Sequence, residues 1–474
     1  VYMADNQKMV DRACALAYEA WQEEIEGDQS KKLEKRKIVA ERAGKILEED
    51  MFDIAATMVC EVAKGQASAL GEDEETIDFA NLYLSGIDEV FESHLYQPFL
   101  RAESNRLIKV PKGPVVAIKP WNLPLSLMAD VVFAAYLAGC PVIMKPAEQS
   151  PLTAWWLWHA MIKAGADPRM ISYLPGYGDI GEALVRHPLV KYISFTGSVE
   201  VGALINKVAG DVYAENPYAF PLGKKEIELE TGGSNPMIIT PYANMDEAIQ
   251  GVRDSKFPPQ KCSALQRLIC VGDKNHPFWK NFLSRLCDAI QSLEHGHPAD
   301  SYKRYELSAI INKEARNRVK NTIEECRKIK EPILEIKLPE LEKEGYYVGP
   351  VVFEGIPFDS KFQKEEIFGP VLYINFVRTL EEAICRAKMY PHITASIYSQ
   401  LRSECALFVE KMAETAGNIY INRKQTGAEP GRNPFGGKGI AGTNKVGTRD
   451  RAKYFVGEST VTHYKLSQGV LYDE

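Results

Sequence analysis

The chain has 474 residues, of which 45% are hydrophobic and 26% are charged, an ordinary composition for a globular protein. At ~100–200 residues per domain, this length indicates about two to four domains. The formal net charge of -7 disfavours a nucleic-acid-binding protein, and the longest apolar stretch, residues 131–144, is shorter than a membrane-spanning helix.

The first part of the chain, up to about residue 90, predicts helices. In residues 31–47, charged residues alternate with Ile38, Val39, Ala43 and Ile46, which lie at helical spacing. We therefore expect this segment to be helical.

From residue 107 onward, short apolar strands alternate with helical stretches, a pattern typical of a parallel, doubly wound sheet. Such sheets bind ligands at the carboxyl ends of their strands. Strands are expected at residues 115–118, 141–144, 171–174 and 192–195, and helices at residues 127–138 and 152–164.

A second block of alternating elements follows, so two α/β domains are the economical interpretation and the predicted fold class is α/β. The last segment, residues 459–466, is rich in strand formers, and we expect it to pair with another element or subunit. In the second block, strands are expected at residues 236–240, 268–271, 351–353, 371–376 and 395–398.

Gly176, Gly178 and Gly181 form a G-x-G-x-x-G pattern between a predicted strand and a predicted helix at residues 182–186. The pattern lacks the acidic residue at a strand end ~20 residues further on that a dinucleotide-binding fingerprint requires. It therefore either contacts a pyrophosphate or makes only a tight strand-to-helix turn.

Two more candidate ligand sites lie at predicted strand ends. Gly197 and Ser198 follow a strand and begin a helix, whose free N–H groups suit an anion, although Ser198 alternatively only caps the helix. Lys145 and Glu148 follow another strand and either bind ribose hydroxyls or form a surface pair. If Glu148 binds a ribose, its charge would repel a 2′-phosphate and favour NAD over NADP.

The nine cysteines are odd in number and include no C-x-x-C pair, which argues against a zinc site and a disulfide framework. Reduced thiols indicate the cytoplasm, or the mitochondrial matrix if a leader was removed, and no signal peptide is recognisable. Cys262 stands apart because it lies in a loop beside Lys261, whose charge would favour a thiolate. Cys262 is either a nucleophile or another buried thiol, and Glu230 and the loop at residues 434–439 either carry chemistry or only accompany turns.

Taken in order, seven of these segments resemble motifs of the aldehyde dehydrogenase superfamily, and the likeness runs from about residue 13 to the C-terminus. The resemblance implies a Rossmann-like NAD-binding domain (residues 1–93 and 111–228), an α/β catalytic domain (residues 229–450) and a small β oligomerisation arm (residues 94–110 and 451–474). It implies NAD as the cofactor, a small aldehyde as the substrate and a homo-oligomer that is a dimer or tetramer. Together with the charge, hydropathy and cysteine spacing above, we expect no metal, membrane or nucleic-acid partner. The seven segments are Pro120-Trp121-Asn122, Lys145-Pro146-Ala147-Glu148, Phe195-Thr196-Gly197-Ser198, Glu230-x-Gly232-Gly233, Gln260-Lys261-Cys262, Glu366-Ile367-Phe368-Gly369-Pro370 and Pro434-Phe435-Gly436-Gly437.

By this resemblance, Cys262 is the nucleophile, and the Asn122 side-chain amide and the Cys262 N–H hold the oxyanion. Glu230 is the general base that activates water for thioester hydrolysis. The residues implied for cofactor binding are Trp121, Lys145, Glu148, Gly178, Gly197, Ser198, Glu366 and Phe368.

The residues around Cys262 and the segment 422–447 resemble the 1-pyrroline-5-carboxylate (L-glutamate γ-semialdehyde) dehydrogenases within this superfamily. The implied reaction is oxidation of L-glutamate γ-semialdehyde to L-glutamate in proline catabolism. In that group, a serine and a Gly-Ala pair anchor the α-carboxylate of the substrate, and a phenylalanine packs on its methylenes. Those residues are Ser263, Gly427, Ala428 and Phe435 here.

Two prolines depart from the family pattern. Pro258 and Pro259 precede Cys262 where a glycine is usual, and each proline fixes φ near about -65° and lacks an N–H donor. We therefore expect a stiffer or differently shaped catalytic loop. The alternatives are a dehydrogenase for another small semialdehyde or a general aldehyde, and a non-enzymatic binding protein that kept the fold.

Overall fold

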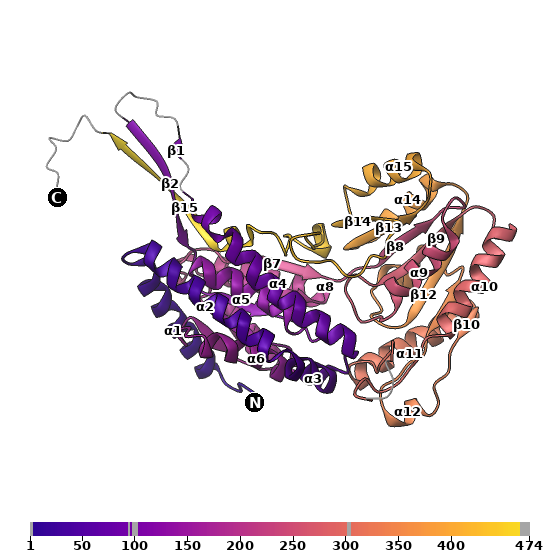
Figure 1. The fold of residues 1–474 in the computed structure, drawn as a ribbon, viewed down its shortest axis with the longest axis horizontal. Helices are drawn as coiled ribbons and strands as arrows, with labels where there is room; N and C mark the ends of the chain where they lie inside the picture. The colour runs from indigo at the N-terminus through magenta and orange to yellow at the C-terminus, as the bar shows by residue number, and fades with distance from the viewer. Residues whose placement is uncertain (1–2, 93–94, 97–102, 301–304, 465–474) are drawn as a thin grey trace.

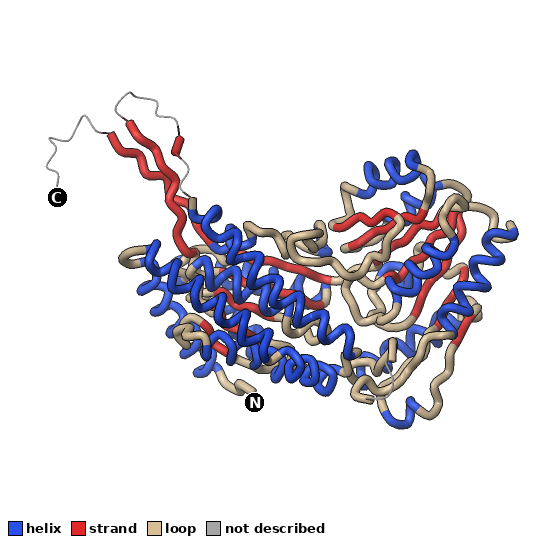
Figure 2. The backbone as a smooth tube through the Cα atoms, viewed as in Figure 1, coloured by secondary structure: helices blue, strands red, loops and turns tan. Residues whose placement is uncertain are grey.

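The computed structural model describes residues 3–92, 95–96, 103–300 and 305–464. Figure 1 shows two α/β halves side by side, the first in indigo and magenta and the second in pink and orange. A narrow arm projects from the first half, and Figure 2 shows that its described part consists of strands. The α/β fold class predicted from the sequence is confirmed.

The first half is built on a five-stranded parallel sheet with helices on both faces. Its strands are β3 (Val115–Ile118), β4 (Val142–Lys145), β5 (Ile171–Tyr173), β6 (Tyr192–Gly197) and β7 (Glu226–Thr231). They lie in the order β5-β4-β3-β6-β7. Because side chains alternate between the two faces of a strand, Val115 and Ala117 pack into one apolar cluster and Val116 packs into another.

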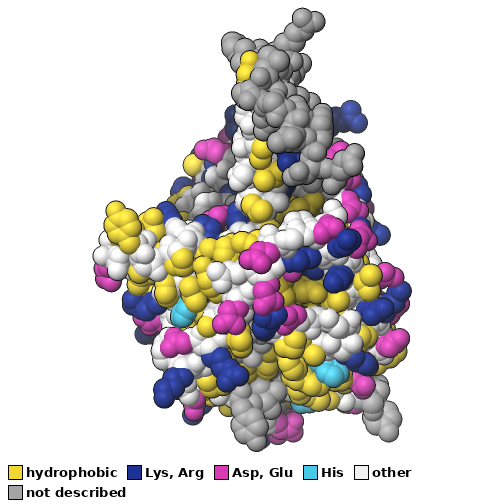
Figure 3. Space-filling model, turned by 90° about the vertical axis from the view of Figure 1, so that its left-hand side faces the viewer, with side chains coloured by type: hydrophobic (Ala, Val, Ile, Leu, Met, Phe, Trp, Pro, Cys, Tyr) yellow, Lys and Arg dark blue, Asp and Glu magenta, His cyan; other side chains and the backbone are white. Residues whose placement is uncertain are grey.

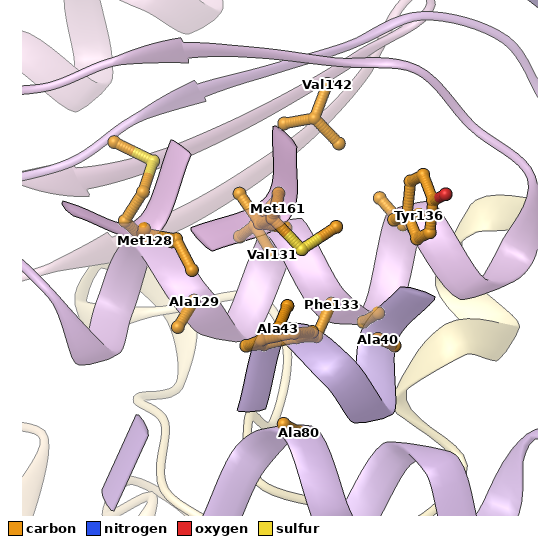
Figure 4. Packing of buried hydrophobic residues seen from close by; sticks show 14 of the residues in the cluster. Ala40, Ala43, Ala80, Met128, Ala129, Val131, Phe133, Tyr136, Val142 and Met161 are labelled. Carbon is orange, nitrogen blue, oxygen red and sulfur yellow. The ribbon is translucent and has the colours of Figure 1, made fainter. Parts of the chain in front are cut away.

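Helix α5 (Ser126–Ala138) lies at the centre of the first half, and every residue of this helix except Leu127 is buried. Figure 4 shows Phe133 of this helix near Ala40 and Ala43 of the neighbouring helix, whose small side chains leave room for the ring. The other helices of this half are α1 (Gln7–Ile25), α2 (Gln29–Glu49), α3 (Met51–Val62), α4 (Gln66–Phe91), α6 (Pro151–Lys163), α7 (Gly178–Arg186), α8 (Val199–Glu215) and the 3₁₀ turn η1 (Pro217–Ala219).

The second half is built on a seven-stranded sheet that is parallel except at one edge. The strands are β8 (Asn235–Ile239), β9 (Leu265–Val271), β10 (Leu334–Glu335), β11 (Val351–Glu354), β12 (Val371–Val377), β13 (Thr394–Tyr398) and β14 (Asn418–Ile421). Their order is β10-β11-β12-β9-β8-β13-β14, and only the β10–β11 pair is antiparallel. The helices are α9 (Met245–Lys256), α10 (Pro277–Gln291), α11 (Lys313–Arg327), α12 (Leu341–Glu344), α13 (Lys361–Lys364), α14 (Leu380–Lys388) and α15 (Arg402–Met412). The chain then returns to the first half, where the 3₁₀ turn η2 (Gly439–Ala441) packs on β7 and η3 (Arg451–Phe455) packs on α4 and α5.

The arm is an antiparallel sheet of β1 (Leu95–Tyr96), β2 (Glu103–Pro111) and β15 (Val456–Tyr464). Strand β15 pairs with β2 along its whole length, and most of its side chains are exposed. Figure 3 shows the arm above a body surface on which hydrophobic and charged side chains are mixed. The predicted C-terminal strand is confirmed up to residue 464, and its last two positions, with other parts of the predicted arm, lie outside the described residues.

The sequence placed most elements correctly, including the helical first part of the chain, which forms α1 to α4. One boundary was wrong: the helix expected at residues 182–186 begins at Gly178, so the second glycine of the G-x-G-x-x-G pattern already belongs to α7. All nine cysteines are free. Within the described part of the chain, none of the helices combines the length and apolarity needed to cross a membrane.

Candidate active site

A cleft with a volume of about 820 Å3 lies where the carboxyl ends of the first sheet face the second half of the molecule. It brings together most of the residues that the sequence singled out, although they come from segments far apart in the chain. The predicted site residues that line it are Trp121, Asn122, Gly197, Ser198, Glu230, Cys262, Ser263, Glu366, Phe368, Gly427, Ala428 and Phe435.

Cys262 is half-buried in the loop before β9, and its backbone carbonyl accepts a hydrogen bond of 2.8 Å from the Asn235 side chain. Burial, followed by the negative charges of Glu366 and Glu230, raises the pKa of the Cys262 thiol to about 12. The thiol is therefore the resting form at neutral pH. The two carboxylates that raise its pKa, Glu366 and Glu230, line the same cleft.

The prediction that Lys261 favours a Cys262 thiolate was wrong. The side chain of Lys261 lies among other charges. Burial is the main cause that lowers its pKa, the charges of Lys64 and Lys424 lower the pKa further, and the charge of Glu75 raises it. Consecutive side chains point in different directions, so a neighbour in sequence does not have to be a neighbour in space. The thiol consequently has carboxylates and no lysine among the charges that dominate its pKa.

Pro258 follows a cis peptide bond after Phe257. The expectation of a stiffer or differently shaped catalytic loop stays a prediction.

Glu230 ends inside the cleft near the carboxyl end of β7, with 8% of its surface exposed. One carboxylate oxygen, Oε2, accepts a hydrogen bond of 3.2 Å from the Gly437 N–H. The other, Oε1, has no hydrogen-bond partner among the described residues. Burial, followed by the charge of Glu228, raises the pKa of Glu230 to about 8. A carboxylate with one free oxygen and this pKa is suited to exchange protons near neutral pH.

The late glycine-rich loop holds this end of β7 in place. The Thr231 hydroxyl donates a hydrogen bond of 2.6 Å to the Ile440 carbonyl, and Glu230 pairs with Gly442 as an isolated antiparallel bridge. A Cβ atom added at Gly442 would lie 2.8 Å from Oε2 of Glu230 and 2.6 Å from the Gly437 nitrogen. Glycine is therefore needed at Gly442 for the loop to approach the carboxylate.

Glu366 lies in the loop before β12 and lines the same cleft, with its carboxylate beside Gly232. Burial raises its pKa to about 8, although the charge of Lys256 and a hydrogen bond from the Gly233 N–H lower it. Nearby, the rings of Trp121 and Phe368 meet edge to face at a centroid distance of 5.7 Å. The cleft thus contains two carboxylates that are partly protonated at neutral pH and a pair of aromatic rings.

The segment carrying Asn122 is fixed by buried charges. The Lys64 ammonium donates a 2.9 Å hydrogen bond to the Asn122 carbonyl and pairs with Glu72. Glu72 in turn accepts hydrogen bonds of 2.8 and 3.0 Å from the N–H groups of Leu125 and Ser126 at the start of α5. This network holds the Asn122 backbone at the cleft wall and leaves its side-chain amide to whatever occupies the cleft.

The residues predicted to anchor a substrate carboxylate lie at the same cleft. Gly427 has a φ of 79°, a left-handed conformation that glycine adopts without strain. Ser263, the residue after Cys262, is buried. Its backbone carbonyl accepts a hydrogen bond of 3.3 Å from the Thr394 hydroxyl. The chemistry available here is a serine hydroxyl and loop N–H groups, which can bind an anion without a formal positive charge.

Three predicted cofactor residues, Lys145, Glu148 and Gly178, do not line this cleft but lie at or beyond the carboxyl end of β4 and the start of α7. Lys145 is buried, its ammonium donates a 3.2 Å hydrogen bond to the Pro146 carbonyl, and its Cε would lie 3.7 Å from a Cβ added at Gly181. Glu148 is exposed. The structure therefore brings the lysine and the glycine-rich turn together beside the edge of the same sheet.

Lys119 and Glu75 are among the charged residues of the cleft that sequence reasoning missed. Lys119 follows β3 directly, which is a sequence signal for a ligand position in a parallel sheet. Glu75 lies on α4, and burial, followed by the charge of Glu72, raises its pKa to about 7. Nothing local in the sequence of α4 indicates that Glu75 lines the cleft.

Residues 2–461 match the model of the aldehyde dehydrogenase family. A curated relative, the 1-pyrroline-5-carboxylate dehydrogenase of Geobacillus sp. (strain WCH70), is 30% identical over 94% of this chain and 84% of its own length. Among solved structures, a 1-pyrroline-5-carboxylate dehydrogenase from Thermus with bound NAD is 29% identical with a TM-score of 0.88, covering 97% of this chain and 86% of that one. Proline utilization A from Bdellovibrio bacteriovorus is 32% identical with a TM-score of 0.90, covering all of this chain and 47% of that longer one. The fold that the seven motifs predicted is confirmed.

Proposed function

Because the chain belongs to the aldehyde dehydrogenase family, we propose that it oxidises an aldehyde to a carboxylic acid with NAD as the oxidant. The observation that carries this proposal is that Cys262, Glu230 and Asn122 line a single cleft. A nucleophile, a base and an amide donor in one cleft are the groups that acyl chemistry through a thioester requires.

In the proposed first step, the Cys262 sulfur forms a bond to the aldehyde carbon while the thiol proton passes to a carboxylate. Glu230 and Glu366 are the carboxylates whose charges act on this thiol. As the carbonyl oxygen gains negative charge, the Asn122 side-chain amide and the Cys262 N–H donate hydrogen bonds to it.

NAD, when bound, accepts the hydride that the aldehyde carbon loses, and the acyl group is left on Cys262 as a thioester. Glu230 then takes a proton from a water molecule, whose oxygen forms a bond to the acyl carbon. The carbon–sulfur bond breaks with its electron pair on sulfur, the carboxylic acid leaves, and the sulfur takes up a proton.

The residues proposed to hold NAD carry groups that can bind its riboses and its pyrophosphate. Glu366 on one side, and Lys145 with Glu148 on the other, offer acceptors and a donor to vicinal hydroxyls. Ser198, the N-cap of α8, lies at a helix N-terminus that favours an anion. The exposed Glu148 carboxylate would repel a 2′-phosphate, so NAD is preferred over NADP. The remaining proposed contacts are Trp121, Gly178, Gly197 and Phe368.

For the substrate, we propose L-glutamate γ-semialdehyde, which yields L-glutamate. Two of the relatives reported above are named 1-pyrroline-5-carboxylate dehydrogenases, and Ser263, Gly427 and Ala428, the proposed anion site, line the same cleft as Cys262. Phe435 supports the proposal because its ring lines the cleft and offers an apolar contact for the substrate methylenes.

We propose the domain division that the sequence suggested, with the five-stranded sheet in an NAD-binding domain, the seven-stranded sheet in a catalytic domain, and residues 94–110 and 451–474 in the arm. The exposed side chains of β15 support a role of the arm in joining identical chains into a dimer or tetramer. Size-exclusion chromatography with light scattering tests this role, since removal of residues 457–474 should yield monomers if the arm joins them.

The test of the function is NADH formation, followed by absorbance, with glutamate γ-semialdehyde, succinate semialdehyde and a simple alkyl aldehyde. The proposed substrate should give the highest kcat/KM. Ser263→Ala should raise the KM for glutamate γ-semialdehyde about tenfold, because it removes one hydrogen bond to a charged group of the substrate. The KM for the alkyl aldehyde, which lacks that group, should stay unchanged. Preference for an aldehyde without the α-amino acid group would refute the substrate, and absence of NADH with all three would refute the activity.

A further inference from the structure

One face of the five-stranded sheet carries a row of polar side chains that leads to the proposed general base. Strand β6 pairs with β7 in register, Ser194 with Glu228 and Thr196 with Glu230. Side chains two residues apart lie on the same face of a strand, and paired residues of parallel strands share a face. Ser194, Thr196, Glu228 and Glu230 therefore lie together on one face, with Glu230 nearest the cleft.

Buried charges from other elements pack on this face. The Arg451 guanidinium of η3 donates a 2.6 Å hydrogen bond to Glu228 and a 3.0 Å bond to Asp130 of α5. The Tyr192 hydroxyl donates a 3.0 Å hydrogen bond to Glu228, and the Tyr83 hydroxyl donates one to Asp130. Two carboxylates around one guanidinium leave this cluster with a net charge of minus one beneath the cleft.

Lys119 brings the missing positive charge. It is 4% exposed, it lines the cleft, and its ammonium donates hydrogen bonds of 2.9 Å to the Ser194 hydroxyl and 3.0 Å to the Thr196 hydroxyl. An ammonium has three donors, so one remains for a water molecule or other occupant of the cleft. No ion pair joins Lys119 to a carboxylate among the described residues, and its charge is therefore not neutralised by direct contact.

The position of Lys119 is defined relative to Glu230. Its ammonium binds the hydroxyl of Thr196, whose Cα partner on the adjacent strand is Glu230. The Lys119 ammonium and Glu230 are therefore associated with adjacent positions on one face of the sheet, and each charge acts on the other.

Building on the proposed base role of Glu230, we propose that Lys119 is a positioning residue that makes ionisation of this carboxylate less costly during thioester hydrolysis. With Lys119 present, the charges beneath the cleft sum to zero before Glu230 ionises. Without it, Glu230 would have to ionise beside an existing net negative charge in a buried site, which is strongly disfavoured. Lys119 touches neither the sulfur nor the substrate in this role and acts through the base.

The other charges that face Glu230 support this assignment. Glu228, on its own strand, raises the pKa of Glu230, whereas Lys119 and Arg451 lower it. Lys445 of the late loop interacts with Glu230 as well, but its ammonium is engaged by three acceptors from the Gly417, Asn418 and Gly436 region. Cys262 carries no charge at rest. Lys119 is therefore the cation whose removal changes the charge next to the base most directly.

The test is the pH dependence of acid release in Lys119→Met, a neutral side chain of similar length, measured by quenched flow after the burst of NADH. We expect the midpoint of the pH profile to rise by about one unit or more, and acid release below both midpoints to fall about tenfold or more. The NADH burst should remain, because it precedes water attack. Lys119→Arg, which keeps the charge, should restore the wild-type midpoint.

The matched control is Lys225→Met. Lys225 is another buried lysine, and it lies just before β7, at the end of that strand away from Glu230. Its ammonium donates hydrogen bonds to the His187 and Val190 carbonyls. Its loss should lower stability without moving the midpoint. If Lys119→Met does not fold, Lys119→Gln, which keeps a donor for the two hydroxyls, replaces it.

An unchanged midpoint in the neutral variant, or equal shifts in both lysine variants, would overturn the role of Lys119. Failure of the wild-type protein to produce NADH would instead overturn the proposed function, so the two failures are distinguishable.

Discussion

Substituting Gly232 by alanine tests the proposed binding of a cofactor ribose by Glu366, because it displaces the Glu366 carboxylate without substituting Glu366 itself. A Cβ atom at Gly232 would lie 1.8 Å from Oε2 of Glu366 and 2.5 Å from its Cδ. Ordinary carbon–oxygen contacts need well over 3 Å, so the carboxylate has to move. We expect this displacement to cost about 1–3 kcal/mol of stability through overpacking.

The displaced carboxylate would also lose its contact with the cofactor. A hydrogen bond to a charged group contributes about 1.5–3 kcal/mol, so the Kd for NAD should rise about 10- to 100-fold. Titration calorimetry with NAD measures this, and the KM for NAD should follow it. Gly210→Ala, on α8 where an added Cβ meets nothing within 4 Å, is the control and should leave the Kd unchanged.

A double-variant cycle separates the local clash from a general loss of structure. In Glu366→Ala the carboxylate is gone, so adding Gly232→Ala should cost little further stability, and the two changes should be strongly non-additive. NAD affinity that is unchanged in Gly232→Ala, at a confirmed loss of stability, would refute the assignment of Glu366 to the ribose.

Three further predictions follow from the same geometry. Cys262→Ala should abolish NADH formation while NAD still binds by calorimetry, and retained turnover would contradict the nucleophile assignment. Because the pKa of Glu230 is raised to about 8, acid release by the wild-type protein should increase about tenfold per pH unit up to pH 8 and then level off. Glu230→Gln should give an NADH burst, a flat pH profile and about 100-fold slower acid release. A pH profile that the substitution leaves unchanged would count against the base role. Arg451→Met leaves Asp130 and Glu228 buried without their cation. The free energy of unfolding, measured in urea, should therefore fall by about 3–5 kcal/mol. A loss below about 1 kcal/mol would contradict a stabilising role of the buried network.

The sequence predicted those parts of the fold that depend on local pattern. The strand at Val115–Ile118 was recognisable because buried parallel strands are continuously apolar, and its end at a proline placed Trp121 and Asn122 at the carboxyl edge. The site residues were recognised by their motifs, and the structure brings most of them to one cleft.

What the sequence could not predict depends on how strands and loops meet. Lys119 gains its relation to Glu230 only through the pairing of β6 with β7, which joins residues far apart in the chain. Lys261 misled for the opposite reason: adjacency in sequence suggested a contact with Cys262, but its side chain lies among the charges of Lys64, Lys424 and Glu75.

Burial makes negative charge costly on three residues of the cleft. Burial raises the pKa of both Glu230 and Glu366 to about 8 and that of Cys262 to about 12, so an extra negative charge on any of them is costly near pH 7. Each carboxylate has a buried lysine from a different element acting on it, Lys119 on Glu230 and Lys256 on Glu366. No such lysine is among the charges that dominate the pKa of the thiol. In the proposed mechanism its deprotonation would therefore depend on the carboxylates, which would alternate between accepting and releasing a proton.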